Sequence, residues 1–382
     1  MMTLPEQLGQ ILIVGIDGGP GGNGWNREIE NFLGTVRPGG VIFFQRNIKT
    51  APEFRQLVES VRDFLETPPF LALDLEGGQV DRLRDVLAPL PSVRDVAKAR
   101  MGKALGRIAG RELASLALNV DFAPVLDLGA PESRKILGSR TAGRSPTAVV
   151  RFAQSFLEGL SEFGISGCGK HFPGLGSAQK DSHHELPTVD KEEWELWQRD
   201  LRPFFALAAK LPMIMVAHVY CPGLESGPSP IGEAAAQPLP ATLSRRIVSG
   251  LLKERMKFPG LVLADDLEMG GILEGRTMDE AAVSALKAGC DMLLLCGPTA
   301  NTRRTFDALL REAAVDPYFH GIVERAAEKV LIAKKRLGII GQPPLQTPDE
   351  FDSLRQKIKE FSDAVQRQLQ RTGASEGSKE ES

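Results

Sequence analysis

Short apolar segments alternate with longer segments of helical period along most of the chain, and this alternation constrains the fold more than any other feature. The apolar segments are nearly continuous runs of aliphatic residues, as is typical of parallel strands covered on both faces. The predicted strands are 11–17, 40–44, 70–74, 121–127, 167–171, 213–218, 260–265 and 291–296. The predicted helices are 26–35, 51–66, 95–118, 148–163, 191–209, 243–257, 278–288, 301–314 and 324–337.

Strict alternation of eight strands with helices predicts an α/β fold, a single (β/α)8 TIM-type barrel that spans residues 1–341. A doubly wound open sheet would show the same alternation. The barrel is favoured because polar residues end several different strands, and only a closed ring brings all of those ends to one rim. These polar residues are Asp74, Asp127, Lys170, His171, His218, Asp265 and Asp266.

The composition changes after Gly341. Residues 342–371 read as a proline-bearing linker followed by an amphipathic helix over 350–369, with its apolar residues on one side. We expect this helix to pack on the barrel, and a dimer contact is the alternative. Residues 372–382 are small, polar and charged, which predicts a disordered tail.

Composition indicates an ordinary soluble protein. The 382 residues are 42% hydrophobic with a formal net charge of −3, which argues against partners such as nucleic acid or a membrane surface. The apolar run Ile11–Ile16 is too short and wrongly flanked for a signal peptide. Four scattered cysteines fit free thiols in a reducing cytoplasm. No cluster has metal-ligand spacing, so we expect neither a metal nor another cofactor.

The segment 170–187 concentrates polar and titratable residues directly after a predicted strand. It holds three of the five histidines, and Gly174 and Gly176 make a loop more favourable than a helix. Asp181 lies two residues before His183, close enough for its carboxylate to orient an imidazole that donates and accepts protons near neutral pH. A polar surface loop is the alternative, but this concentration of residues favours a site. We expect residues 174–186 to be mobile and to close on substrate.

Two adjacent carboxylates, Asp265 and Asp266, follow the seventh predicted strand. Ionised carboxylates at the end of a buried strand are costly unless they are paired or used, although one could cap the next helix. A rim carboxylate opposite a histidine acid could run a covalent glycoside mechanism, in which the carboxylate attacks the anomeric carbon and the other group protonates the leaving oxygen.

Four motifs, in order, resemble glycoside hydrolase family 3, in particular its β-N-acetylglucosaminidase (β-hexosaminidase) branch. They are Asp74–Arg82 (Asp-Leu-Glu-Gly-Gly-Gln-Val-Asp-Arg), Asp121–Asp127, Lys170–Gly176 with Asp181-Ser182-His183, and Leu251–Asp266. The resemblance spans about residues 8 to 338. The chain departs from the family pattern at Leu175, where histidine is frequent, and at Ala264, where serine or threonine commonly precedes the nucleophile.

The resemblance implies roles for individual residues. Asp265 would be the catalytic nucleophile, and His183 the general acid and then the general base with Asp181 as its partner. The hydroxyls of the terminal sugar would be bound by Asp74, Arg82, Arg140, Lys170 and His171. The implied enzyme is a retaining exo-β-N-acetylglucosaminidase, with peptidoglycan muropeptide fragments as its implied substrates.

Three alternatives stay open from the sequence. A neutral histidine acid/base would let phosphate approach a glycosyl-enzyme, which would make the protein a phosphorylase. The sugar specificity could be that of a β-glucosidase. A non-catalytic sugar-binding protein is less favoured, since Asp181, His183 and Asp265 are all present. We expect a small carbohydrate as the partner and a monomer or a weak homodimer.

Overall fold

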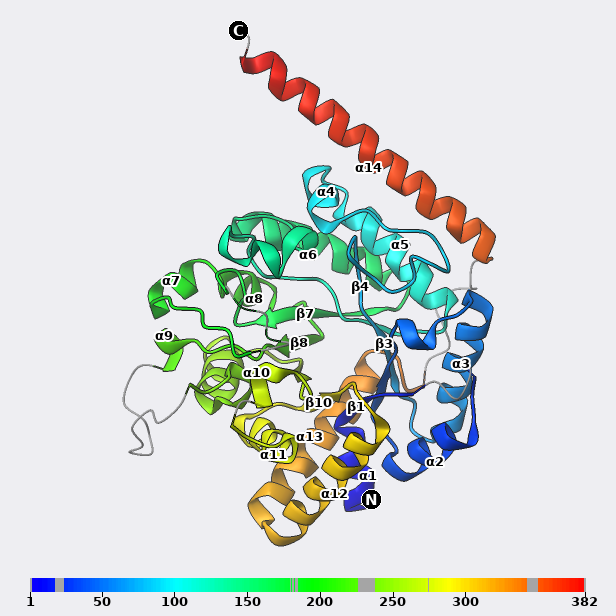
Figure 1. Ribbon diagram of the computed structural model, residues 1–382, viewed down its shortest axis with the longest axis vertical. Coiled ribbons are helices and arrows are strands. Elements are labelled where there is room, and N and C mark those ends of the chain that lie inside the picture. Colours follow the sequence, from blue (N-terminus) through cyan, green and yellow to red (C-terminus); the bar gives the residue numbers. More distant parts are fainter. Residues whose placement is uncertain are drawn as a thin grey trace.

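Eight parallel strands close into a barrel in the computed structural model, which describes residues 2–17, 24–178, 180, 182, 185–225, 238–273, 275–341 and 350–380 (Figure 1). The order around the ring is β1-β10-β9-β8-β7-β6-β3-β2, and every neighbouring pair is parallel. The barrel strands are β1 (Leu12–Gly15), β2 (Gly40–Ile42), β3 (Phe70–Leu73), β6 (Val120–Asp121), β7 (Ser166–Phe172), β8 (Met213–Val216), β9 (Leu261–Asp266) and β10 (Met292–Leu295). The barrel prediction is confirmed, and the open sheet is wrong.

Helices surround the ring, so the strands are buried on both faces, as their continuous apolar sequences predict. The longer ones are α2 (Arg27–Val36), α3 (Ala51–Phe64), α5 (Gly102–Ser115), α6 (Pro146–Ser161), the π-helical η5 (Arg246–Arg255), α11 (Met278–Ala288), α12 (Thr299–Val315) and α13 (Pro317–Arg336). The shorter ones are α1 (Leu4–Gln10), α4 (Val93–Lys98), α7 (Glu193–Gln198), α8 (Arg202–Leu207), α9 (Pro222–Glu225) and α10 (Gly270–Leu273). The 3-10 turns are η1 (Gln45–Asn47), η2 (Glu132–Lys135), η3 (Gly138–Arg140) and η4 (Ala241–Leu243).

Three predicted elements differ from the structure. The segment 95–118 is two helices, α4 and α5, because the backbone turns at Arg100, whose φ is +56°. The segment 191–209 is likewise divided into α7 and α8, and Pro203 lies in the first turn of α8, where proline is tolerated. The strand over 121–127 is reduced to β6, because Pro124 has no N–H for the sheet and interrupts the regular pairing.

A small hairpin rises from the carboxyl end of β3 and carries polar residues over the barrel mouth. Its strands β4 (Leu75–Gly77) and β5 (Val80–Asp81) are antiparallel and pair Leu75 with Asp81. The turn requires φ of +97° at Gly77 and +62° at Gly78, a conformation that favours glycine. A Cβ on Gly77 would also lie 2.8 Å from the carbonyl oxygen of Pro91. The two glycines of the sequence motif therefore shape the hairpin.

The C-terminal helix α14 (Phe351–Glu380) runs past α4 and α5 and packs against both, while its far end projects beyond them (Figure 1). Its buried residues are Leu354, Ile358, Phe361 and Val365. The prediction that the helix packs on the barrel is thus confirmed. The helix extends beyond Leu369 to Glu380, and disorder of the tail 372–382 stays a prediction.

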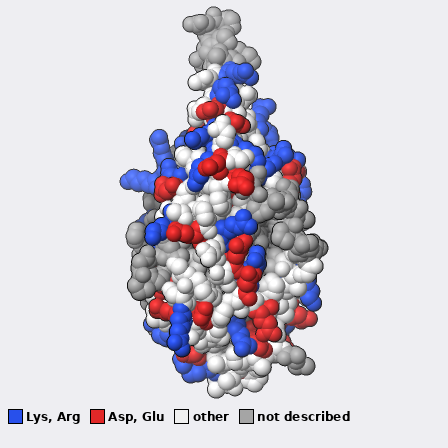
Figure 2. Space-filling view, turned by 90° about the vertical axis from the view of Figure 1, so that its right-hand side faces the viewer, with Lys and Arg blue, Asp and Glu red and all other residues white. Residues whose placement is uncertain are grey.

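Charged side chains of both signs are interspersed over the barrel and along the described part of the projecting helix on the face in Figure 2. This distribution agrees with the small net charge of −3. Within the described ranges, no helix has both the length and the apolar character needed to cross a bilayer.

Candidate active site

The carboxyl ends of β3, β7 and β9 surround a cavity of about 240 Å³ at the barrel mouth. Six residues predicted from the sequence line this cavity: Asp74, Arg82, Arg140, Lys170, His171 and Asp265. They come from positions nearly 200 residues apart in the chain, which the closed ring brings together. This convergence makes the cavity the candidate active site.

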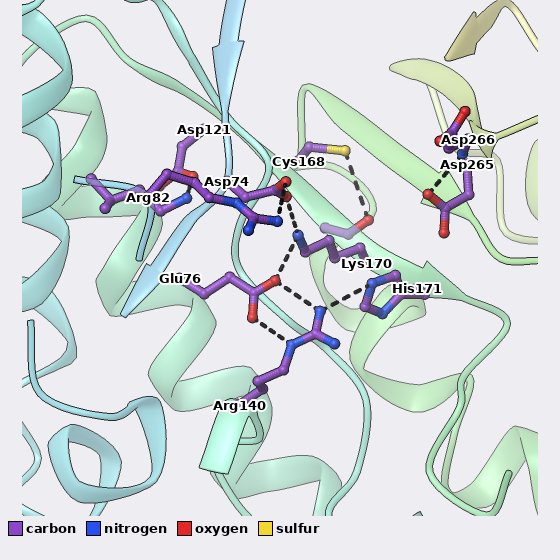
Figure 3. A network of polar contacts seen from close by, with 12 residues as sticks. Asp74, Glu76, Arg82, Asp121, Arg140, Cys168, Lys170, His171, Asp265 and Asp266 are labelled. Carbon is purple, nitrogen blue, oxygen red and sulfur yellow. Dashed lines mark hydrogen bonds and ion pairs between the residues drawn. The ribbon is translucent and has the colours of Figure 1, made fainter. Parts of the chain in front are cut away.

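One side of the cavity is built from oppositely charged groups in direct contact (Figure 3). The Lys170 ammonium lies 2.7 Å from a carboxylate oxygen of Asp74 and 2.6 Å from one of Glu76. Arg140 donates to both oxygens of Glu76, from Nε at 2.8 Å and from Nη2 at 2.9 Å. Such two-pronged, charge-assisted contacts fix the direction of a guanidinium. Glu76 therefore holds two cations at the cavity wall.

These groups stay charged although they are buried. Burial alone would raise the pKa of Glu76, but the charges of Lys170 and Arg140 bring that pKa down to about 2. Burial alone would lower the pKa of Lys170, yet the carboxylates of Asp74 and Glu76 raise it above its usual value. The network is therefore ionised across the physiological pH range and can offer directed hydrogen bonds to a neutral ligand.

His171 is held in a defined orientation between a carboxylate and a guanidinium. Its Nδ1 lies 2.7 Å from Oδ2 of Asp127, and its Nε2 lies 3.4 Å from Nη2 of Arg140. A guanidinium can only donate, so Nε2 must present its lone pair and Nδ1 must carry the proton that Asp127 accepts. Asp127 also accepts from the backbone N–H of Leu175 at 2.7 Å, which ties the following loop to the same carboxylate.

Arg82 reaches the cavity from the end of the β4–β5 hairpin and is held more loosely. Its Nη2 lies 3.8 Å from a carboxylate oxygen of Asp74, and its guanidinium carbon lies 5.9 Å from the centre of the Phe44 ring. With 36% of its side chain exposed, Arg82 gains little from that ion pair. Its position therefore depends on the backbone that carries it.

Two carboxylates at the end of β9 form the other side of the cavity, Asp265 and Asp266 (Figure 3). Burial acts to raise the pKa of Asp265, but interactions with His218 and His171 outweigh it, so that this pKa lies below the usual value. Burial raises the pKa of Asp266 to about 6, although this carboxylate accepts hydrogen bonds from the N–H groups of Glu268 and Cys296, which act to lower the pKa. Asp265 is thus the more readily ionised of the two carboxylates that line the cavity.

The predicted acid/base pair, Asp181 and His183, lies outside the described residues. Ser182 between them is described: it lines the cavity, and its carbonyl accepts the N–H of Gly271 at 3.0 Å. His218 is buried, with Nδ1 2.8 Å from the hydroxyl of Thr242 and Nε2 2.9 Å from the carbonyl of Asp266. His218 is therefore a hydrogen-bonded structural residue behind the end of β9.

Two residues of the site were given no role from the sequence, Glu76 and Asp127. Both are almost fully buried, with 1% of each residue exposed. A charged residue at the end of a buried strand must be paired, and that rule could have assigned each of them to a cationic or imidazole partner. Neither could be matched to a particular partner without the geometry of the closed barrel.

Residues 3–333 match the glycosyl hydrolase family 3 N terminal domain. The chain belongs to glycosyl hydrolase family 3. This confirms the resemblance read from the four motifs, and the protein is a glycosidase, an enzyme that hydrolyses O-glycosyl bonds. The charged cavity at the mouth of its barrel is where a family 3 enzyme of this fold is expected to act.

Three known proteins illustrate the family relationship. A beta-hexosaminidase of Idiomarina loihiensis is 33% identical over 288 residues, which cover 74% of this chain and 83% of the relative. A beta-hexosaminidase of Alkalilimnicola ehrlichii is 36% identical over 279 residues, which cover 70% of this chain and 76% of the relative. The solved structure of a family 3 beta-N-acetylglucosaminidase from Paenibacillus sp. has a TM-score of 0.81 at 29% identity, covering 95% of this chain and 69% of that one.

Proposed function

We propose that this family 3 glycosidase is a retaining exo-β-N-acetylglucosaminidase that releases terminal GlcNAc from glycans. The observation that carries the proposal is an ionised carboxylate, Asp265, across a small cavity from a fixed network of charged hydrogen-bonding groups. The relatives that are named beta-hexosaminidase or beta-N-acetylglucosaminidase support the choice of sugar.

The network suits the recognition of one terminal sugar. Charged groups around a neutral ring make strong hydrogen bonds to hydroxyls, and they disfavour ligands that leave those groups unpaired. In the proposal Asp74, Arg82, Arg140, Lys170 and His171 bind the hydroxyls. The cavity of about 240 Å³ is below the roughly 300–1,000 Å³ of sites that enclose drug-sized ligands. Such a cavity favours the removal of single sugars from the end of a glycan.

The proposed reaction has two steps. The Asp265 carboxylate attacks the anomeric carbon while the bond to the glycosidic oxygen breaks, and His183, oriented by Asp181, donates a proton to that leaving oxygen. His183 then takes a proton from water, whose oxygen attacks the anomeric carbon and releases Asp265. Two successive inversions at that carbon retain its configuration. The lowered pKa of Asp265 supports the nucleophile assignment, since only the ionised carboxylate can attack.

The natural substrate in this proposal is a fragment of peptidoglycan that ends in β-linked GlcNAc. This assignment rests on the resemblance to the N-acetylglucosaminidase branch, in which such muropeptides are the implied substrates. A comparison of turnover on matched GlcNAc, glucose and xylose glycosides tests the sugar specificity. A preference for glucosides would replace the proposal with a β-glucosidase.

A mechanism-based fluorosugar of the GlcNAc series tests the chemistry. The expected result is a stable covalent adduct on the peptide that contains Asp265, found by mass mapping, and no adduct in Asp265→Ala. Adduct on another peptide would reassign the nucleophile. Adding phosphate during turnover separates the hydrolase from a phosphorylase, because release of a sugar 1-phosphate would overturn the assignment of water as the acceptor.

A further inference from the structure

We propose that the C-terminal helix α14 braces the loop that carries Arg82 and so sets the position of this residue in the sugar-binding cavity. The loop comprises residues 82–91, between the β4–β5 hairpin and α4. Arg82, its first residue, lines the cavity, and α14 contacts the same loop through Arg355 and Ser362. The inference rests on the proposed function of Arg82 as a sugar ligand.

The loop is tied to the hairpin at both of its ends. One carboxylate oxygen of Asp81 accepts the N–H of Leu83 at 3.0 Å, and the other accepts the N–H of Leu90 at 2.9 Å. The carbonyl of Leu90 accepts the N–H of Gly78 at 3.1 Å. A displacement of the loop would therefore be transmitted to the backbone on either side of Arg82.

The helix holds the loop between these two ties. The guanidinium of Arg355 donates to the carbonyl of Val86 from Nε at 3.2 Å and from Nη2 at 2.9 Å. The Ser362 hydroxyl lies 3.4 Å from the carbonyl of Pro89. A two-pronged, charge-assisted contact restricts both the position and the direction of the carbonyl that accepts it. The Val86 carbonyl is thus anchored to one rigid element, and the Ser362 hydroxyl, which also lies 3.0 Å from the carbonyl of Ile358, adds a looser contact at Pro89.

The helix itself is firmly seated, which is what a brace requires. Its apolar residues Leu354, Ile358 and Val365 are fully buried. They lie on the side of α14 that packs against α4 and α5, the helices that follow the loop in the chain (Figure 1). Arg355 and Ser362 are therefore presented to the loop from a fixed backbone.

Arg82 needs such support because its own contacts at the mouth are weak. Its nearest carboxylate, on Asp74, is 3.8 Å away, whereas Lys170 approaches the same side chain to 2.7 Å. Loss of the brace should therefore leave the Lys170 contact intact and let Arg82 move. Because Arg82 acts in the binding of sugar, the expected change is in KM rather than in kcat.

Steady-state turnover of a chromogenic β-GlcNAc substrate by the full-length protein tests the inference. Arg355→Ala should raise KM about threefold to tenfold, at the lower end of couplings within one network, with kcat nearly unchanged. The exposed Arg367→Ala on the same helix is the matched control and should match the wild type. In the Arg82→Ala background, Arg355→Ala should add nothing further to KM, because the residue that it positions is absent.

Hydrogen exchange of the peptide that spans residues 80–92 gives a readout independent of turnover. Arg355→Ala should speed exchange in this peptide and leave exchange in the strand peptides unchanged. If the alanine variant folds poorly, the milder Arg355→Lys replaces it and should show the same change to a smaller degree. The brace is overturned if Arg82→Ala weakens binding but Arg355→Ala changes neither KM nor exchange. If the wild type does not turn over the substrate, the proposed function fails, and exchange alone decides the brace.

Discussion

The two sides of the barrel mouth both carry carboxylates, but the carboxylates of one side are bonded to charged or imidazole side chains and those of the other to backbone N–H groups. On one side, which we call the paired side, Asp74, Glu76 and Asp127 each lie within 2.6–2.8 Å of Lys170, Arg140 or His171. On the other, the reactive side, Asp265 accepts the N–H of Asp266 at 2.9 Å, and Asp266 accepts backbone N–H groups of Glu268 and Cys296, each at 3.2 Å (Figure 3).

This difference separates carboxylates that can bind the substrate from a carboxylate that can attack it. A carboxylate whose oxygens are occupied by close cations is well stabilised, and its negative charge is neutralised, so it is a poor nucleophile. A carboxylate that is kept ionised by imidazoles and by one backbone N–H, with no cation bonded to it among the described residues, keeps an oxygen for a new bond. The paired side therefore fixes the substrate, and the reactive side supplies the nucleophile.

The largest expected effect comes from removing the nucleophile of the reactive side. Asp265→Asn should lower kcat on a β-GlcNAc glycoside by at least about 10³-fold, as is usual for the loss of a group that forms the covalent intermediate. Binding of a non-hydrolysable GlcNAc analogue should change little, since the paired side is intact. Isothermal titration and turnover measured on the same preparation check both parts.

The matched control is Asp307→Asn, which changes an exposed aspartate on α12 and should leave turnover unchanged. Retention of wild-type kcat by Asp265→Asn would place the nucleophile elsewhere. Loss of both binding and turnover would remove the distinction between the two sides of the mouth.

The next effect concerns the centre of the paired side. Glu76→Gln keeps the shape of the side chain but removes the negative charge between the buried Lys170 and Arg140. Such a change typically lowers the free energy of unfolding by about 3–5 kcal/mol. The pKa of Glu76 is lowered from 4.5 to about 2, so its contribution to stability is complete above about pH 4.5 and is lost as the pH falls toward 2. The stability gap between wild type and variant should therefore shrink over that interval.

Denaturant unfolding at several pH values measures this gap. Glu59→Gln is the control, because Glu59 pairs with Arg55 at 3.0 Å on a partly exposed helix surface, and its replacement should lower the free energy of unfolding by less than about 0.5 kcal/mol. Equal losses of unfolding free energy in the two variants would show that burial does not make the ion pairs of Glu76 more important for stability than a surface pair.

Asp266 on the reactive side should show the opposite dependence on pH. Its pKa is raised from 3.8 to about 6, so ionisation of this group destabilises the fold. The wild type should lose about 2 kcal/mol of stability, relative to Asp266→Asn, as the pH rises from about 4 to 7. Asparagine can still accept from the N–H groups of Glu268 and Cys296. Unfolding curves that differ by a constant amount at all pH values would contradict this interpretation.

The sequence was enough to predict the ring of strands and six of the residues around its mouth. The barrel follows from the alternation of apolar and helical segments, and Asp74, Lys170 and Asp265 follow from their place at strand ends. The roles of these residues as nucleophile or sugar ligand came from the family motifs and stay proposals.

The pairing between side chains could not be predicted. Glu76 lies two residues after Asp74 in the same motif, yet only the hairpin geometry shows that Glu76 takes two close cations, while Asp74 takes Lys170 at 2.7 Å and Arg82 only at 3.8 Å. The contact of Arg355 with Val86 joins residues 269 positions apart and follows no periodic pattern. Such contacts depend on how whole elements pack, and a pattern within one segment carries no information about them.

The smallest expected effect tests the link between Asp127 and His171. Asp127 accepts from His171 Nδ1–H on Oδ2 and from the Leu175 N–H on Oδ1, and an asparagine at position 127 keeps only one of these two oxygens. A lost hydrogen bond of this kind costs about 1–2 kcal/mol, which corresponds to roughly tenfold in kcat/KM if His171 turns. NMR of the imidazole nitrogens should then show the proton moved to Nε2, where it opposes the Arg140 donor. An unchanged tautomer together with unchanged kcat/KM would mean that Arg140 alone orients the ring, and that the paired side depends on Glu76 rather than on Asp127.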